Sequence, residues 1–140
     1  MKILAAIDQS EYATLVLAKA MKLAAQEGAE LTALTISNAP FTNLYLGEIS
    51  GEFLEKMREG VQKTVSRAQQ EAKTAGAKVD VVVEESPSAA DAIVKFAEKN
   101  KIDLIVIGNK GAGAVERFLI GSVSSQVVTH SPCSVLVVKK

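Results

Sequence analysis

The sequence predicts an α/β domain built around an open, doubly wound parallel sheet of five strands, with helices on both faces. Five short apolar runs alternate with four stretches in which apolar residues recur every three or four positions. This alternation indicates β-α-β units with right-handed crossovers. Most of the apolar runs are continuous rather than alternating, which is typical of strands covered on both faces.

The first strand and helix come at the start of the chain. The apolar run Ile3–Ile7 predicts the strand. The stretch Ser10–Glu27 has apolar residues at helical spacing, and Gly28 supplies the residue that commonly ends a helix. The opening letters MKILAAIDQS also resemble a signal peptide, but Asp8 interrupts the apolar run too early, so a strand is the better interpretation.

The second and third strands bracket the longest helix. The second strand, Leu31–Ile36, is the exception to continuous burial because two threonines interrupt it. A long connection follows, and then an amphipathic stretch at Gly51–Ala75 that Gly76 closes. The third strand is expected at Val79–Val83.

The last part of the chain predicts two more helices around the fourth strand, Leu104–Ile107. The helix before the fourth strand begins near Pro87, which suits the first helical position. Ser88 with Asp91 resembles a capping box there. The second helix runs from Gly121 or Ser122 to His130, and the letters SPC break it. The last helix is therefore expected at residues 121–130. The fifth strand is expected at Val135–Val138.

The composition fits one domain covering residues 1–140. Hydrophobic residues make up 48% of the chain, which is enough for a core and excludes a disordered tail. The 16 basic residues balance the 16 acidic ones, so no overall field gathers nucleic acid or an anionic membrane. No apolar run approaches the roughly 20 residues that span a bilayer. The single cysteine, Cys133, suits a reducing compartment, and the expected location is the cytoplasm.

A ligand site is expected at the carboxyl ends of the strands, where open α/β sheets bind ligands. Asp8 follows the first strand, Ser37 and Asn38 follow the second, and the glycine-rich letters GNKGAGAVERFLIGS follow the fourth. These features converge on one crevice if the first and fourth strands are neighbours.

The glycine-rich loop has the composition of an anion site. Its four glycines can adopt positive φ angles and let another group approach the backbone, and the following helix points its positive end into the same space. The hydroxyls of Ser122 and Ser124 can donate to phosphate oxygens, and Lys110 and Arg117 add positive charge. A polyphosphate is therefore the expected occupant, although a plain strand-to-helix turn remains the alternative. The loop lacks the Walker A and dinucleotide-binding patterns.

The spacing Gly108-x2-Gly111-x9-Gly121-Ser122 resembles the nucleotide-binding signature of the universal stress protein family. The resemblance covers the whole chain, including ILAAIDQSEYA at the start and GSVSSQVVTHSPCSVLVVK at the end. It implies a Rossmann-like fold with strand order 3-2-1-4-5. It also implies ATP binding and a homodimer that forms through the C-terminal strand, Val135–Val138.

The same resemblance assigns roles to individual residues. Asp8 lies near the ribose and phosphates, and the backbone of Ile36 reads the adenine. Glycines line the ribose and phosphates, and the start of the last helix holds the phosphates. The cofactor-binding residues implied are Asp8, Ile36, Gly108, Lys110, Gly111, Gly121, Ser122, Val123 and Ser124. The cofactor is ATP, with ADP or AMP as alternatives, and Mg²⁺, where present, is carried by the phosphates.

Several positions depart from the family pattern or allow a second interpretation. Gln9, Ser86, Lys110 and Ser134 differ from the usual residues, and Gln9 bears on the approach of the ribose. Asp8 is also a suitable helix cap, although Ser10 serves equally well. The aromatic residues within 41–45 cover the nucleotide, dock a partner or pack on their own domain.

Three functions follow in order of preference. The first is an ATP-binding regulatory protein of the stress response, with partners that the sequence does not name. The second is a slow ATPase, which is disfavoured because only Asp8 is clearly placed for catalysis. The third is an interaction module without a ligand. A flavin site is also disfavoured, because no aromatic residue sits at the predicted strand ends.

Overall fold

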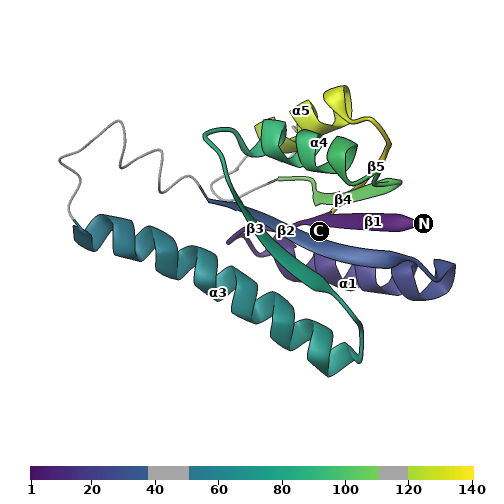
Figure 1. Ribbon diagram of the computed structural model, residues 1–140, viewed down its shortest axis with the longest axis horizontal. Helices are drawn as coiled ribbons and strands as arrows, with labels where there is room; N and C mark the ends of the chain where they lie inside the picture. The colour runs from purple at the N-terminus through teal and green to yellow at the C-terminus, as the bar shows by residue number, and fades with distance from the viewer. Residues whose placement is uncertain (38–50, 111–119) are drawn as a thin grey trace.

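Five parallel strands form the centre of the molecule (Figure 1). The computed structural model describes residues 1–37, 51–110 and 120–140. The strands lie in the order β3-β2-β1-β4-β5, which confirms the order that the sequence resemblance implied. Their bounds differ from the predicted ones by one or two residues: β1 is Lys2–Ala6, β2 Glu30–Ser37, β3 Asp80–Glu85, β4 Leu104–Gly108 and β5 Ser134–Val138.

Two helices cover each face of the sheet, as the sequence predicts (Figure 1). The long helix α3 lies beside α1 on one face, and the shorter α4 and α5 lie together on the other. No described helix is both long enough and apolar enough to cross a membrane. The bounds are Tyr12–Glu27 for α1, Gly51–Ala75 for α3, Ala89–Lys99 for α4 and Ser122–His130 for α5.

The buried side chains of the central strands explain why their apolar runs are continuous. Ile3 and Ala5 of β1 pack into a core with α1, whereas Leu4 and Ala6 of the same strand pack into a second core with α4 and α5. Successive residues of a strand point to opposite faces, so a sheet buried on both faces needs apolar residues at every position.

The helix ends follow the predicted signals in part. Gly28 and Gly76 both have left-handed backbone angles, with φ of 62° and 65°, as expected for residues that end helices. Ser88 caps α4, because its hydroxyl accepts a hydrogen bond from the backbone N–H of Asp91 at 3.2 Å. The prediction for Pro87 was wrong by two positions, since it precedes the cap and α4 begins at Ala89.

The capping box around Ser88 is only half formed. In a complete box the side chain of residue 91 would accept from the backbone N–H of Ser88. Here that N–H donates to the Ser86 hydroxyl at 3.2 Å, and the Asp91 carboxylate pairs with Lys95 at 3.0 Å. The Ser86 hydroxyl therefore takes the place of the Asp91 carboxylate as the acceptor for the Ser88 N–H. The Asp91 carboxylate forms a surface ion pair instead.

The strand order creates a switch point beside β1. The chain leaves β1 toward β2 and β3, then crosses back to place β4 and β5 on the other side. The predicted adjacency of the first and fourth strands is thus confirmed, with Ile3, Leu4 and Ala5 opposite residues 104–106. The carboxyl ends of β1, β2 and β4 consequently meet at one edge, where open α/β sheets bind ligands.

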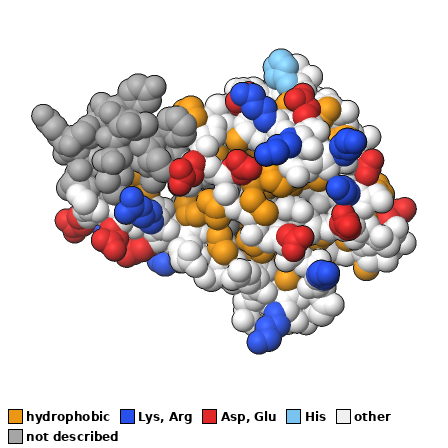
Figure 2. All heavy atoms as spheres, in the orientation of Figure 1, with side chains coloured by type: hydrophobic (Ala, Val, Ile, Leu, Met, Phe, Trp, Pro, Cys, Tyr) orange, Lys and Arg blue, Asp and Glu red, His pale blue; other side chains and the backbone are white. Residues whose placement is uncertain are grey.

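Charges of both signs are interspersed over the face of the molecule seen in Figure 2. Neither sign forms a continuous field on this face. The balanced distribution agrees with the zero net charge of the chain and gives no reason to expect a polyanionic surface partner there.

Candidate functional site

A pocket of about 120 Å³ lies at the switch point, at the carboxyl ends of β1, β2 and β4. Residues from α1, α4 and the first turn of α5 complete its walls. Its lining residues are Ala6, Ile7, Asp8, Ser10, Tyr12, Ala13, Val16, Leu34, Ile36, Ala89, Ile93, Ile107, Gly108, Lys110, Val123 and Ser124.

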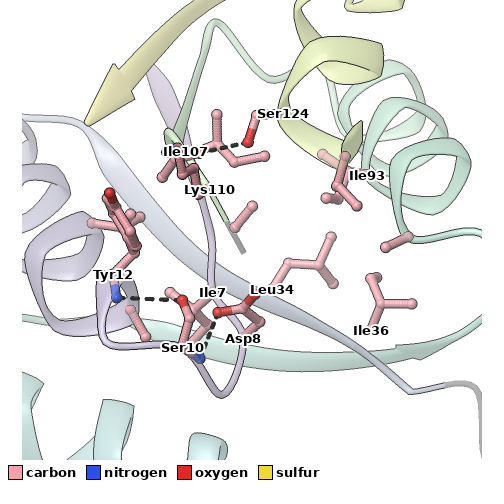
Figure 3. A pocket seen from close by; sticks show the side chains of 16 residues that line it. Ile7, Asp8, Ser10, Tyr12, Leu34, Ile36, Ile93, Ile107, Lys110 and Ser124 are labelled. Carbon is pink, nitrogen blue, oxygen red and sulfur yellow. Dashed lines mark hydrogen bonds between the residues drawn. The ribbon is translucent and has the colours of Figure 1, made fainter. Parts of the chain in front are cut away.

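The pocket has a polar side and an apolar side (Figure 3). Asp8, Ser10 and Tyr12 lie on the side formed by the end of β1 and the start of α1. Ile36 and Ile93 lie on the opposite side, where β2 and α4 approach each other. The pocket therefore suits a ligand with one apolar part and one polar part.

A short turn after β1 positions the polar side. One oxygen of the Asp8 carboxylate accepts from the backbone N–H of Ser10 at 2.8 Å. The Ser10 hydroxyl in turn accepts from the backbone N–H of Tyr12 at 3.3 Å. Asp8 is thus not the cap of α1, and its exposed carboxylate stays at the pocket while it stabilises the turn. These bonds also explain why α1 begins at Tyr12 rather than at Ser10.

Gly108 is required at the end of β4 because Tyr12 occupies the space of a side chain there. A Cβ atom added to Gly108 would lie 2.8 Å from the Tyr12 Cβ and 3.1 Å from its Cγ and Cδ1. Gly108 and Gly121 do not use the positive φ angles that glycine allows, since Gly28 and Gly76 are the only described glycines with positive φ. Close approach, rather than an unusual backbone conformation, explains the glycine at position 108.

Hydrogen bonds join the end of β4 to the start of α5. The Ser124 hydroxyl is buried and donates to the carbonyl oxygen of Gly108 at 2.6 Å. The backbone N–H of Gly121 donates to the carbonyl oxygen of Asn109 at 2.8 Å. These two bonds fix α5 beside the pocket, and they commit the Ser124 proton to the protein, so its hydroxyl does not donate to a ligand in this arrangement.

Six of the nine predicted binding residues line the pocket: Asp8, Ile36, Gly108, Lys110, Val123 and Ser124. Gly121 and Ser122 lie at the start of α5 but are not among its lining residues. Gly111 and Arg117 lie outside the described residues, as do the aromatic residues within 41–45.

Gln9 lies against α3, away from the pocket lining. A Cβ atom added to Gly60 would overlap the Gln9 Nε2 atom, so the amide occupies the space that this helical glycine leaves open. Gln9 is absent from the pocket lining. Its side chain therefore fills a site on α3 in this structure rather than the expected path of a ribose.

Sequence reasoning missed Tyr12, which is an aromatic residue in the pocket wall. The expectation concerned aromatic residues at the predicted strand ends, whereas Tyr12 reaches the pocket from the first residue of α1. It also missed Ala89 and Ile93 of α4. The only feature of the sequence that pointed to these two residues was the apolar stripe of α4. Such a stripe does not distinguish residues of a pocket wall from residues of the core.

The charged groups of the pocket are one carboxylate and one ammonium group. Asp8 and Lys110 are the only charged residues among the described residues that line it. Within residues 1–37, 51–110 and 120–140, no three His, Cys, Asp or Glu side chains are close enough together to hold a metal ion. The described part of the pocket thus offers a cation for an anionic ligand and a charged acceptor for hydroxyl groups.

The family model described as the universal stress protein family matches residues 1–139 of this chain. A putative universal stress protein of Staphylococcus haemolyticus is 36% identical over 139 residues. The match covers 98% of this chain and 83% of that relative.

Solved structures with the same fold include proteins described with bound nucleotides. The universal stress protein UspA from Lactobacillus plantarum is 28% identical with a TM-score of 0.81, covering 99% of this chain and 97% of that one. A universal stress protein in complex with cAMP is 26% identical with a TM-score of 0.72, covering 99% and 96%. A universal stress protein from Archaeoglobus fulgidus in complex with dAMP is 25% identical with a TM-score of 0.66, covering 98% and 96%.

Proposed function

The chain belongs to the universal stress protein family, and on that premise we propose that it is a regulatory protein that binds an adenine nucleotide and acts as a homodimer. The pocket at the switch point carries this proposal, because its apolar side suits a purine and its polar side suits a ribose and phosphates. ATP is the nucleotide that the glycine signature favours. The relatives in complex with cAMP and dAMP support an adenine nucleotide more generally.

The proposed pose follows the two sides of the pocket. The adenine lies between Ile36 and Ile93, with the backbone of Ile36 reading its edge. The carboxylate of Asp8 accepts from ribose hydroxyls, and Lys110 pairs with a phosphate. The start of α5 faces the phosphates with the N–H groups of its first turn, for which the N-cap residue Gly121 supplies no side-chain acceptor.

Binding rather than hydrolysis is the proposed activity. Phosphoryl transfer needs positioned charge, a metal site and a group that orients water. Asp8 is the only acidic residue among the described lining residues, and its carboxylate already holds the turn to Ser10. We therefore expect the protein to hydrolyse ATP weakly at most. A phosphate-release assay tests this expectation. Measurable turnover by the wild type that is lost in Asp8→Ala would favour hydrolysis over binding alone.

Nucleotide occupancy is the proposed regulatory signal. A ligand that binds only the folded protein stabilises it by about 2.7 kcal/mol at a concentration one hundred times its Kd. Ile36 of β2 and Gly108 of β4 line the pocket at the carboxyl edge of the sheet, so occupancy would change the surface that this edge presents to partner proteins.

Isothermal titration calorimetry with ATP, ADP and AMP tests the proposal. We expect binding in the micromolar range, on the order of −8 kcal/mol. The Asp8→Ala variant should bind roughly tenfold or more weakly, because it loses a charged acceptor for the ribose. Asp91→Ala, the same chemical change on the exposed surface of α4, is the matched control and should bind as the wild type does. Absence of heat with all three nucleotides at millimolar concentration would refute the proposal.

A further inference from the structure

Tyr12 is held in the pocket wall by the same turn that carries Asp8. Its backbone N–H donates to the Ser10 hydroxyl, and the Ser10 N–H donates to the Asp8 carboxylate. Tyr12 is also the first residue of α1, so its Cα position is fixed both by the turn and by the helix.

The Tyr12 ring is packed on two sides. Its Cβ, Cγ and Cδ1 atoms cover Gly108, with the distances of 2.8 to 3.1 Å given above for an added Cβ. It also packs against the core cluster that includes Ala5 and Val106. A ring held in this way is a rigid wall, which costs little conformational entropy when a ligand settles against it.

The Tyr12 hydroxyl is available to a ligand. Among the described residues it has no hydrogen-bond partner, and no described side-chain oxygen is both buried and without a partner. The hydroxyl therefore reaches solvent. Figure 3 shows the Tyr12 ring on the polar side of the pocket, across from Ile36 and Ile93.

We propose that Tyr12 is a binding residue of this pocket, whose ring borders the ribose and phosphate portion of the nucleotide and whose hydroxyl donates to a phosphate oxygen. The inference rests on the proposed function, which places the adenine on the opposite, apolar side. A hydroxyl donor beside the carboxyl end of β4 also complements Lys110, because the two supply a neutral and a charged donor to one anion.

A purely structural role for Tyr12 makes a different prediction. If the ring only fills the space over Gly108, loss of the hydroxyl leaves the affinity for every ligand unchanged, because phenylalanine fills the same space. If the hydroxyl binds phosphate, its loss weakens ligands that carry a phosphate and leaves the nucleoside unaffected.

Calorimetric titration of the full chain with AMP and with adenosine separates these roles. For Tyr12→Phe we expect AMP affinity to fall roughly tenfold or more, as for loss of a hydrogen bond to a charged group, and adenosine affinity to change less than about twofold. Ser66→Ala removes an exposed hydroxyl on α3 and should leave both affinities unchanged. Thermal melts check that Tyr12→Phe folds like the wild type.

Fluorine NMR supplies a direct readout. The chain has two tyrosines, so a protein labelled with 3-fluorotyrosine gives two signals, and Tyr45→Phe identifies the one from Tyr12. We expect AMP to shift the Tyr12 signal. Equal AMP binding by wild type and Tyr12→Phe would overturn this inference alone. Equal weakening of AMP and adenosine would overturn the assignment of the hydroxyl, and a wild type that binds neither AMP nor ATP would overturn the proposed function with it.

Discussion

At position 108 the absence of a side chain determines how closely strand β4 and helix α1 approach each other. The Tyr12 side chain occupies the volume that a Cβ atom would fill. Directly beside this contact, the buried Ser124 hydroxyl donates to the Gly108 carbonyl oxygen. One residue therefore joins β4 to α1 through packing and to α5 through a hydrogen bond, and the pocket lies where these three elements meet.

Gly108→Ala should destabilise the protein by about 1–3 kcal/mol, the usual cost of overpacking a rigid contact. The new methyl group would overlap Tyr12 at its Cβ, an atom fixed by the backbone, so no side-chain rotation relieves the overlap. Urea unfolding of the variant measures this loss.

Gly60→Ala is the informative comparison. Its new methyl group would meet the far end of the flexible Gln9 side chain, which can move away. A glycine inside a helix costs about 1 kcal/mol relative to alanine, so Gly60→Ala should leave stability unchanged or raise it by up to about that amount. Equal destabilisation by the two substitutions would contradict this account of the contacts.

The residues of the site were predictable to different degrees. Asp8, Gly108 and Lys110 lie at the carboxyl end of a strand or two residues beyond it, so their place at the ligand edge follows from the strand pattern alone. Tyr12 was not predictable in this way. It reaches the pocket only because β1 and β4 are adjacent and because position 108, far away in the sequence, has no side chain.

At the scale of elements, helix α4 shows how one polar side chain sets the start of a helix beside the pocket. Ser88 accepts from the backbone N–H of Asp91, and α4 then presents Ala89 and Ile93 to the pocket. The bounds of the helices that line the pocket were harder to predict than their existence. Both α1 and α4 begin later than expected because serine hydroxyls hold the preceding turns, through the bonds of Ser10 and Ser86.

Ser88→Ala should cost about 1 kcal/mol of stability, because it removes the side-chain acceptor of the Asp91 backbone N–H at the start of α4. Lys95→Ala removes the exposed ion pair with Asp91 on the same helix and should cost at most about 0.5 kcal/mol. Chemical denaturation of both variants compares the two losses. A larger loss for Lys95→Ala would show that the surface pair, rather than the cap, stabilises α4.

At the scale of the whole molecule, the sheet has one edge at β3 and the other at β5. An edge strand presents backbone groups that another strand can pair with. The family resemblance favours the β5 edge for the proposed dimer. The sequence could predict the order of strands only through that resemblance, since periodicity alone does not say which strands are neighbours.

A proline substitution tests the dimer. The carbonyl of Val138 accepts from Asn109, so residue 138 faces β4, and Val137 directs its N–H toward the outer edge. Val137→Pro removes that outward donor while it keeps the pairing with β4. We expect sedimentation equilibrium to give twice the 14.8 kDa chain mass for the wild type and one chain mass for Val137→Pro.

Leu136→Pro is the matched control, because its N–H faces β4 and its loss should lower the melting temperature. A folded Val137→Pro variant that keeps the dimer mass would exclude pairing through the β5 edge.

Backbone NMR of the isotopically labelled protein during titration with AMP tests the central claim, that the pocket between β1, β2 and β4 holds an adenine nucleotide. We predict that the amide signals of Asp8, Tyr12, Ile36, Gly108 and Val123 shift together and saturate, while those of the exposed residues of α3 stay in place. Signals that stay unchanged at millimolar AMP, or that shift only outside the pocket, would contradict the claim.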